Sequence, residues 1–394
     1  MNEVAERLRV AARMADIEPF EVMEIQTLAR EVEARGRDVI HLEIGEPDFR
    51  TPAPVVEAAK RALDTQPMFY TSALGLAPLR EAIAGFYRDR YGIDVPASRV
   101  VVTAGSSAAL LLAFGVLLDP GDEVLLADPG YPCNRNFVRA LDAVPRGVPV
   151  GAATRYQLTA ELARRHWTGG TRMAMVASPS NPTGTLVAPA EVAKLAALAR
   201  EKGATLLSDE IYHGLTYGTQ ARTAAEVGED VVVINSFSKY FQMTGWRLGW
   251  MLAPPGLVRH VEILAQNLFI SPSTLAQHAA LACFRPETVA ILEERRAELD
   301  ARRRFLVPGL ESVGLAVPVV PEGAFYVYAD CSKVTADSFA FARELLAEAG
   351  VALTPGKDFG ENEPARHVRI AYTQPIARLE EALERIRRFV SRRT

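Results

Sequence analysis

The sequence predicts an α/β protein with a large domain, built on a mostly parallel seven-stranded sheet covered by helices, and a smaller α+β domain. Short apolar or β-branched runs alternate with helical segments from about residue 99 to residue 234, a rhythm typical of parallel sheets with helices on both faces. After Pro254 helices dominate, and a short mixed portion ends the chain. The 394 residues also exceed what one hydrophobic core usually serves.

The large domain is expected to span residues 45–283, and the smaller domain to combine residues 1–44 with 284–394. The first helix shows apolar residues at helical spacing and ends at the stop signal Gly36. The expected helices are 20–35, 54–63, 76–91, 106–118, 133–141, segments after Gln157 and Ala188, several within 256–313, 337–349 and 375–390. The expected strands are 39–42, 99–103, 123–127, 144–150, 173–177, 205–207, 231–234, 324–328 and 368–371.

Composition and charge exclude several classes of function. A net charge of −4 gives no basis for a nucleic-acid or membrane partner. Cys133, Cys283 and Cys331 lack the CxxC or His-rich spacing of a zinc site, so neither a metal site nor a disulfide framework is expected. The start at Met1 lacks the form of a signal peptide, and no apolar run reaches membrane-spanning length. We therefore expect a cytoplasmic protein.

The chemistry centres on a lysine that follows a buried strand. The β-branched run 231–234 leads into Ser236, Ser238 and Lys239, and Arg247 follows eight positions later. Open α/β sheets hold their ligands in the loops at the carboxyl ends of strands. A lysine among hydroxyls and an arginine at such a place predicts a reactive amine beside a bound phosphate.

Three weaker motifs follow other expected strands. Gly105-Ser-Ser107 opens a helix, where backbone N–H groups and hydroxyls suit an anion, although a serine N-cap is the common alternative. Asn181 lies between two prolines in the turn-rich segment 178–184, which suits either a plain turn or a rigidly mounted amide. Asp209 and Tyr212 can point into one cleft if a helical turn begins there, or can belong to a solvated turn.

In combination these motifs are specific. The set Asn181-Pro-x-Gly184, Asp209-x-x-Tyr212, Ser236-x-Ser-Lys239 and Arg247 resembles the class I (aspartate aminotransferase-like) pyridoxal phosphate-dependent aminotransferases of fold type I, and the match runs over nearly the whole chain. The resemblance implies a transaminase that moves an amino group between an L-amino acid and a 2-oxo acid.

The resemblance also implies roles for the residues. Lys239 would form the Schiff base with the cofactor aldehyde and then move the proton. Asp209 would keep the pyridine nitrogen protonated, and Asn181 and Tyr212 would hydrogen-bond the phenolic oxygen. The phosphate would be held by Gly105, Ser106, Ser107, Ser236, Arg247 and, as a weaker candidate than Ser236, Ser238.

Four further positions rest on the resemblance alone. Tyr131 matches an aromatic ring stacked on the cofactor, and Arg369 matches the arginine that binds the substrate α-carboxylate. Gly45 matches a loop whose backbone approaches the substrate. Tyr70 matches a tyrosine that reaches the phosphate in the neighbouring subunit, which implies a homodimer with shared sites.

Other functions fit less well or stay open. Ser236-Phe-Ser-Lys239 also reads as the Ser-x-x-Lys of penicillin-binding proteins, but their Ser-Asp-Asn and Lys-Thr-Gly partners are missing. No Gly-x-Gly-x-x-Gly follows a strand, which argues against dinucleotide binding. A C–S lyase on the same fold uses the same lysine and cofactor contacts, so β-elimination remains the alternative.

The substrate side chain is the least defined feature. Where one aspartate-specific subgroup has a lysine this chain has Ser107, and the segment 267–273 lacks the arginine of another subgroup. A buried, unpaired carboxylate is costly, so strict dicarboxylate specificity is not expected. Phe20, Tyr70 and Phe269 indicate an apolar or aromatic pocket, whereas Arg135 could still reach a distal acid.

Overall fold

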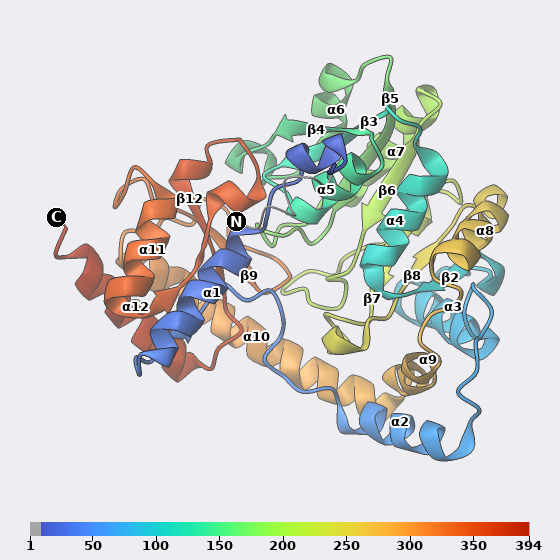
Figure 1. The fold of residues 1–394 in the computed structure, drawn as a ribbon, viewed down its shortest axis with the longest axis horizontal. Coiled ribbons are helices and arrows are strands. Elements are labelled where there is room, and N and C mark those ends of the chain that lie inside the picture. Colours follow the sequence, from blue (N-terminus) through green and yellow to red (C-terminus); the bar gives the residue numbers. More distant parts are fainter. Residues whose placement is uncertain (1–8, 394) are drawn as a thin grey trace.

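The computed structural model describes residues 9–393 and has the predicted α/β fold (Figure 1). The main sheet has seven strands in the order β2-β8-β7-β6-β5-β3-β4. Adjacent strands in this sheet are parallel, except that β8 runs antiparallel to both β2 and β7. The strands are β2 (Val100–Thr103), β3 (Glu123–Asp128), β4 (Val144–Pro149), β5 (Thr171–Ala177), β6 (Thr205–Asp209), β7 (Val232–Ser236) and β8 (Gly249–Leu252).

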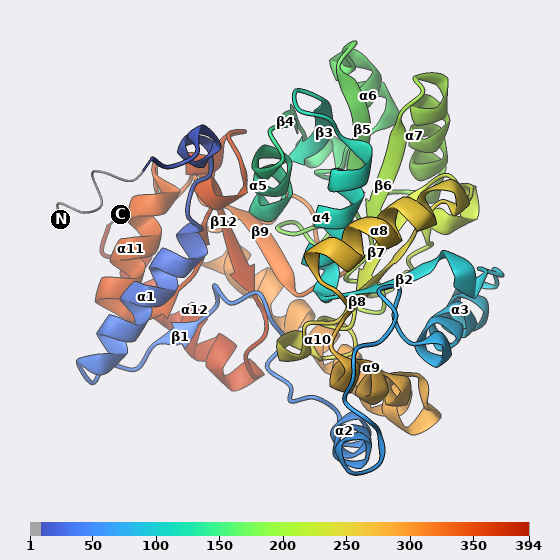
Figure 2. The same cartoon turned by 45° about the vertical axis from the view of Figure 1, so that its right-hand side comes forward.

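Helices cover both faces of this sheet, because its central strands are apolar on both sides. In β3, Val124 and Leu126 face one core and Leu125 faces the other. The first core is completed by α4 (Gly105–Leu117), α5 (Pro132–Ala140) and α8 (Val258–Leu268), with α4 and α8 in front of the sheet in Figure 2. The second is completed by α3 (Ala77–Tyr91), α6 (Ala160–His166) and α7 (Pro189–Glu201).

The strand order reverses between β3 and β5, because the chain leaves β3 for the edge strand β4 and returns to the other side of β3. Such a reversal opens a crevice outside the carboxyl ends of the strands, where open α/β sheets bind ligands. Asp128, Ala177, Asp209 and Ser236 end the four strands around this point. The predicted motifs therefore meet at one edge of the sheet.

A smaller sheet lies beside the large one. Strands β11 (Thr354–Pro355), β12 (His367–Ala371) and β9 (Tyr326–Asp330) form an antiparallel sheet in that order, and β1 (Ile40–His41) pairs in parallel with β10 (Val351–Ala352). The surrounding helices are α1 (Glu21–Ala34), α11 (Ser338–Ala349) and α12 (Ile376–Val390).

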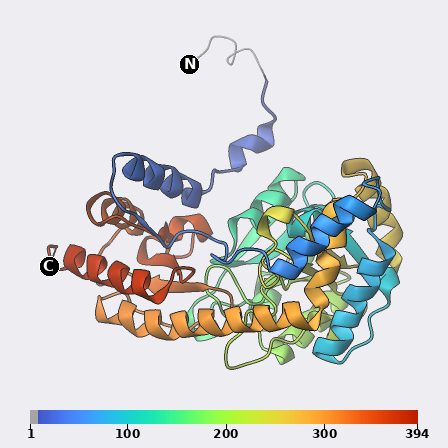
Figure 3. The ribbon, with the colours of Figure 1, turned by 90° about the horizontal axis from the view of Figure 1, so that it is seen from below.

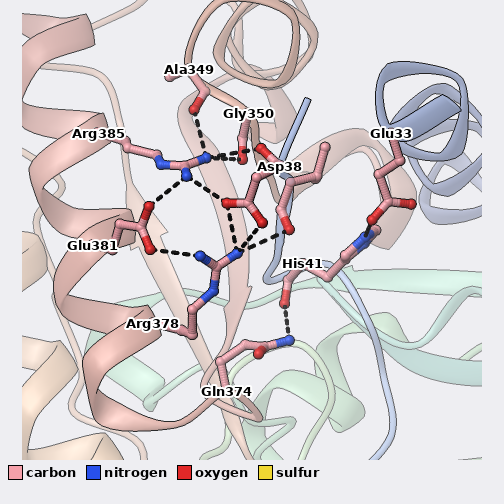
Figure 4. A network of polar contacts seen from close by, with 10 residues as sticks. Glu33, Asp38, His41, Ala349, Gly350, Gln374, Arg378, Glu381 and Arg385 are labelled. Carbon is pink, nitrogen blue, oxygen red and sulfur yellow. Dashed lines mark hydrogen bonds and ion pairs between the residues drawn. The ribbon is translucent and has the colours of Figure 1, made fainter. Parts of the chain in front are cut away.

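Ion pairs fasten the N-terminal segment to the C-terminal helices (Figure 4). The Asp38 carboxylate accepts hydrogen bonds from Arg378 Nη2 at 2.9 Å and from Arg385 Nη2 at 2.6 Å. Arg385 Nη1 also donates to the carbonyls of Ala349 and Gly350, where α11 ends. The hydrogen bond from Arg378 is the main cause of a lowered Asp38 pKa. Asp38, which precedes β1, is thus bound to α12, and Arg385 in turn binds α12 to the end of α11.

The long helix α10 (Pro286–Ser312) runs beneath both sheets (Figure 3). It contacts α12 on one side and α2 (Ala53–Thr65), which packs on α9 (Thr274–Ala280), on the other. The helix α10 thus packs against elements on both sides of the molecule. The domain boundaries expected at residues 45 and 283 stay predictions. Among the residues that the structure describes, we find no helix long and apolar enough to cross a membrane.

Candidate active site

A cavity of about 240 Å³ lies at the carboxyl ends of the central strands, between the large and the small sheet. Residues from β5, β6, the loop after β7 and the start of α4 line it, together with residues of β9 and β12. The predicted site residues that line this cavity are Gly45, Ser106, Ser107, Tyr131, Asn181, Asp209, Tyr212, Ser238, Lys239, Arg247 and Arg369. Residues spread over more than 300 positions are brought together.

Lys239 projects from the loop after β7 into the cavity. Its Nζ donates a hydrogen bond to the Gly45 carbonyl at 2.7 Å and lies 5.9 Å from the centroid of the Tyr212 ring. The Lys239 pKa is lowered to about 8, mainly by burial; the charges of Arg369 and Arg247 act in the same direction, whereas those of Glu46 and Asp209 oppose it. A larger share of this amine is therefore neutral near pH 7 than of an ordinary lysine.

Asp209 ends β6 and is 5% exposed. Its Oδ1 accepts one hydrogen bond, from the Ile211 backbone N–H at 3.2 Å. Burial raises its pKa to about 7, although that hydrogen bond and Lys239 act in the opposite direction. A buried carboxyl with so few partners would hold its charge firmly if a cation bound beside it.

Asn181 and Arg369 contact each other across the cavity. Arg369 Nη1 donates to Asn181 Oδ1 at 3.0 Å, and Nη2 donates to the Glu43 carbonyl at 2.6 Å. The Arg369 guanidinium lies over the Tyr326 ring, 4.4 Å from its centroid. Its buried Nε has no hydrogen-bond partner among residues 9–393. A guanidinium held in this way retains a donor for a further anion.

Tyr212 and Tyr131 form two aromatic sides of the cavity. The Tyr212 hydroxyl lies 3.1 Å from the Tyr326 hydroxyl, and burial holds the Tyr212 pKa well above its usual range. Tyr212 therefore remains a protonated phenol that can donate a hydrogen bond. The Tyr131 ring stacks near Phe20, with centroids 6.2 Å apart and planes at 30°.

The start of α4 forms an anion cradle with Arg247. Ser106 and Ser107 line the cavity in the first turn of this helix, where backbone N–H groups are free. A Cβ at Gly105 would lie 2.8 Å from Arg247 Nη2, so the glycine lets the guanidinium approach the helix end. Arg247 itself has a left-handed backbone, with φ of 53°, which is uncommon for a residue with a side chain.

Three predicted site residues do not line the cavity. Gly105 lies behind Arg247, as described. Ser236, which the sequence favoured over Ser238, points elsewhere: its Oγ donates to the Leu248 carbonyl at 3.4 Å and accepts from the Ser238 N–H at 3.0 Å. Tyr70 is 80% exposed on the surface. The geometry therefore favours Ser238 over Ser236 as a ligand-binding hydroxyl.

Of the residues suggested to contact the substrate side chain, some line the cavity and others do not. Phe20 lines the cavity, whereas Phe269 does not. Arg135 lines a neighbouring pocket of about 430 Å³, and its Nη2 donates to the Asp358 carbonyl at 3.0 Å. Arg135 is thus not among the residues that line the active-site cavity, where a contact with a distal acid of the substrate would be needed.

Sequence reasoning missed several lining residues. They are Val22, Met23, Leu110, Phe137, Thr244, Tyr326, Asp358 and Phe359. Tyr326 occupied an expected strand, but only the three-dimensional structure shows that its hydroxyl lies 3.0 Å from where a Cβ on Gly45 would stand. Asp358 lies in a loop without a motif, and no pattern in the sequence could have selected it.

The site fits the pyridoxal phosphate that the sequence resemblance implies. Lys239 offers an amine with a lowered pKa, and the Asp209 carboxyl, which accepts one hydrogen bond, suits a cationic ring nitrogen. Tyr212 and Asn181 offer a phenol and an amide for an anionic oxygen. The start of α4 with Arg247 suits a phosphate. The ring nitrogen and the phosphate would thus meet groups of opposite charge, and the phenolic oxygen would meet neutral hydrogen-bond donors.

Comparison with known proteins agrees with this chemistry. A family model described as aminotransferase class I and II matches residues 37–386. A valine–pyruvate aminotransferase of Mycobacterium tuberculosis is 43% identical over 96% of this chain and 97% of its own length. A (5-formylfuran-3-yl)methyl phosphate transaminase of Methanocaldococcus jannaschii is 37% identical over 97% of this chain and all of its own. The crystal structure of an aminotransferase from Mycobacterium tuberculosis superposes with a TM-score of 0.94, at 43% identity, covering 98% of this chain and 100% of that one.

Proposed function

The chain belongs to the class I and II aminotransferases, which depend on pyridoxal phosphate, and from that premise we propose how its own residues divide the work and which substrates it prefers. Its reaction transfers an amino group between an amino acid and a 2-oxo acid. The observation that carries the assignment of roles is the convergence of Lys239, Asp209, Asn181 and Arg369 on one cavity.

Lys239 is the amine that holds the cofactor and moves the proton. With a pKa of about 8, roughly a tenth of it is neutral at pH 7, compared with well under a thousandth of an unperturbed lysine. Its neutral form would serve as the base that takes the proton from the substrate Cα. Its position on the loop after β7 keeps it within the cavity for both steps.

Asp209 keeps the ring nitrogen of the cofactor protonated. When bound, pyridoxal phosphate supplies an electron-poor ring that accepts the electron pair left when the Cα–H bond breaks. Asp209 is fixed at the end of β6 and buried, so its charge acts on that nitrogen with little screening by water. Asn181 and Tyr212, which line the same cavity, would donate hydrogen bonds to the phenolic oxygen.

Arg369 orients the amino acid by its α-carboxylate. Its guanidinium is held by the Asn181 amide and the Glu43 carbonyl and faces the cavity. A carboxylate bound there in a bidentate manner would place Cα toward Lys239. At the other end of the cavity Ser106, Ser107, Ser238 and Arg247 hold the phosphate.

The side chain of the amino acid is apolar or aromatic. Phe20, Val22, Met23, Leu110 and Phe137 form an apolar part of the lining. Among the described residues, the cations that line the cavity are Lys239, Arg247 and Arg369, and each already has a role. A distal carboxylate would therefore lose water without gaining a partner, which is costly. The valine–pyruvate relative, named for an apolar amino acid, supports the same preference.

The active enzyme is a homodimer with shared sites. Met68, Phe69 and Tyr70 are exposed at 39%, 77% and 80%, and Leu268 and Ile270 are exposed as well. The two segments are neighbours, since Thr274 Oγ1 donates to the Phe69 carbonyl at 2.7 Å. Apolar side chains gathered on a surface mark an interface with another protein. A second copy that covers this region would receive Tyr70 at its own phosphate site.

An amino-acid panel tests the proposed function. With pyruvate or 2-oxoglutarate as acceptor, we expect amino transfer from valine, leucine, methionine and phenylalanine with kcat/KM at least tenfold above that from aspartate, since one well-packed methylene alone can contribute tenfold. A strong preference for aspartate would contradict the apolar pocket. Release of pyruvate and thiol from cystathionine at a rate above transamination would favour the C–S lyase alternative.

A further inference from the structure

The first turn of α1 forms one wall of the cavity. Phe20, Val22 and Met23 line it, and the Phe20 ring stacks near Tyr131. None of these three residues is among those assigned to the cofactor. The distance of this wall from Arg369 therefore sets how long a substrate side chain can be.

The N-cap residue of this helix supplies no side-chain hydrogen bond to the first turn. The N-cap residue is Phe20, whose side chain cannot accept a hydrogen bond from the free N–H groups of the first turn. Instead Asp358 Oδ1 accepts a hydrogen bond from the Glu21 N–H at 3.0 Å, across 337 positions in the chain. Lys357 Nζ adds an ion pair with Glu21 Oε1 at 3.1 Å, but the lysine side chain is 59% exposed, so screening by water limits what this pair contributes.

Asp358 is itself held firmly. It lies in the 3-10 turn η9 (Gly356–Phe359) and is 3% exposed. Arg135 Nη2 donates to its backbone carbonyl. Burial raises the pKa of the carboxyl, while the charge of Arg369 and the hydrogen bond from Glu21 oppose that rise and favour the charged form, which is the better acceptor.

The turn that carries Asp358 is tied to the strand that carries Arg369. Strand β11 runs directly into η9, and its Thr354 pairs with Arg369 in the sheet. Arg369, proposed to bind the substrate carboxylate, and Asp358, which caps α1, are therefore both held in place by the same short sheet. A substrate held at Arg369 meets the α1 wall at a distance that Asp358 fixes.

We propose that Asp358 is a positioning residue that fixes the first turn of α1 as the far wall of the substrate side-chain pocket, and so favours amino acids with long apolar side chains. This inference rests on the proposed preference for apolar substrates. Asp358 acts through Phe20, Val22 and Met23, not on the reacting atoms.

The kinetic test compares phenylalanine, which reaches the wall, with alanine, which is too short to do so. In Asp358→Ala the ratio of KM for phenylalanine to KM for alanine should rise about tenfold, the effect of losing one close apolar contact. Asp358→Asn should restore most of this ratio, because asparagine caps helices about as well as aspartate. Equal changes for both amino acids, or an Asn variant as impaired as the Ala variant, would overturn the proposal.

A matched control separates this role from a loss of stability. Asp337 caps α11 in the same manner, with Oδ1 accepting from the Phe339 and Ala340 N–H groups, and does not line the cavity. Asp337→Ala should reduce stability without changing the KM ratio. In Phe20→Ala/Asp358→Ala the ratio should rise no further than in the more affected single variant, because both changes remove the same wall. Additive effects would contradict the proposed route through Phe20.

Amide exchange gives a readout that does not depend on the substrate. Exchange in a peptide covering residues 20–28 should accelerate in Asp358→Ala and not in Asp337→Ala or Asp358→Asn. If wild-type enzyme prefers aspartate, the proposed substrate class fails, yet faster exchange would still establish the cap. If exchange is unchanged, the cap itself is refuted, whatever the substrate.

Discussion

Arg369 and Asn181 are in direct contact, with Nη1 donating to Oδ1 at 3.0 Å, although 188 positions separate them in the chain. Asn181 follows β5 of the large sheet and Arg369 lies in β12 of the small one. The contact joins the residue proposed to bind the substrate carboxylate to one proposed to bind the cofactor. Binding of the two ligands is therefore expected to be coupled.

Arg369→Gln should raise KM by about 100-fold for every amino acid, whatever its side chain. Losing one partner of a buried charge pair costs about 3 kcal/mol, which corresponds to that factor. Initial rates with valine and phenylalanine measure it. Arg366→Gln, at an exposed arginine paired with Glu363 and Asp330, is the matched control and should change KM less than threefold. A loss confined to one amino acid would contradict a carboxylate role.

Asp209→Asn should lower kcat by about 10²–10³-fold while the cofactor still binds. The factor is typical for removal of one buried group that stabilises charge in a transition state. Single-turnover rates and the absorbance of the bound cofactor separate the two effects. Glu210→Gln removes the neighbouring buried carboxylate, which faces Ala224 and Ser208 outside the cavity, and should keep kcat within about threefold. Equal losses in the two variants would refute a specific role for Asp209.

Cofactor uptake by the cofactor-free enzyme should depend on pH through Lys239. Only the neutral amine can attack the cofactor aldehyde, and a lowered pKa increases its share at any given pH. The uptake rate should thus rise about tenfold per pH unit below the Lys239 pKa of about 8 and level off above it. Arg369→Gln removes a charge that lowers this pKa, so its plateau should begin at higher pH. A rate that still climbs beyond pH 10 would indicate an unperturbed lysine.

Mixing two impaired variants tests the shared sites of the proposed dimer. Lys239→Ala and Tyr70→Ala should each be impaired alone, the first almost completely. A hybrid dimer has one site with both Lys239 and the partner's Tyr70 intact, so co-refolding should restore activity above the sum of the parents. Lys60→Ala, at an exposed lysine paired with Glu57, replaces Tyr70→Ala in the control mixture. Absence of any gain beyond that control would place Tyr70 outside its partner's site.

The sequence predicted the main elements because their signals are local. The β-branched run before Ser236 and the helix that opens at Gly105 are read directly from neighbouring residues. The apolar run 248–252 is not among the expected strands, and the structure places Gly249–Leu252 between β2 and β7 as the antiparallel β8. Strands β10 and β11 have two residues each, too few for a periodic pattern.

The difference between local signals and contacts distant in sequence also explains which site residues the sequence predicts. Residues in motifs, such as Lys239 and Asp209, were found because their spacing is informative. The preference for Ser236 over Ser238 stays a prediction: Ser238 lines the cavity, whereas Ser236 Oγ donates to the Leu248 carbonyl, and the direction of a side chain after a strand depends on which backbone groups it meets. Asp358 was missed because its importance arises from a contact across 337 positions, which a single sequence does not encode locally.

The most direct test of the account is to locate the amine that holds the cofactor. Reduction of the holoenzyme with borohydride, digestion and mass spectrometry should find the pyridoxyl group on the peptide that contains Lys239. Lys239→Ala should lose this label together with nearly all amino transfer, whereas Lys333→Ala, at an exposed lysine, should keep both. A label on another lysine, or transamination retained in Lys239→Ala, would contradict the central role assigned to Lys239.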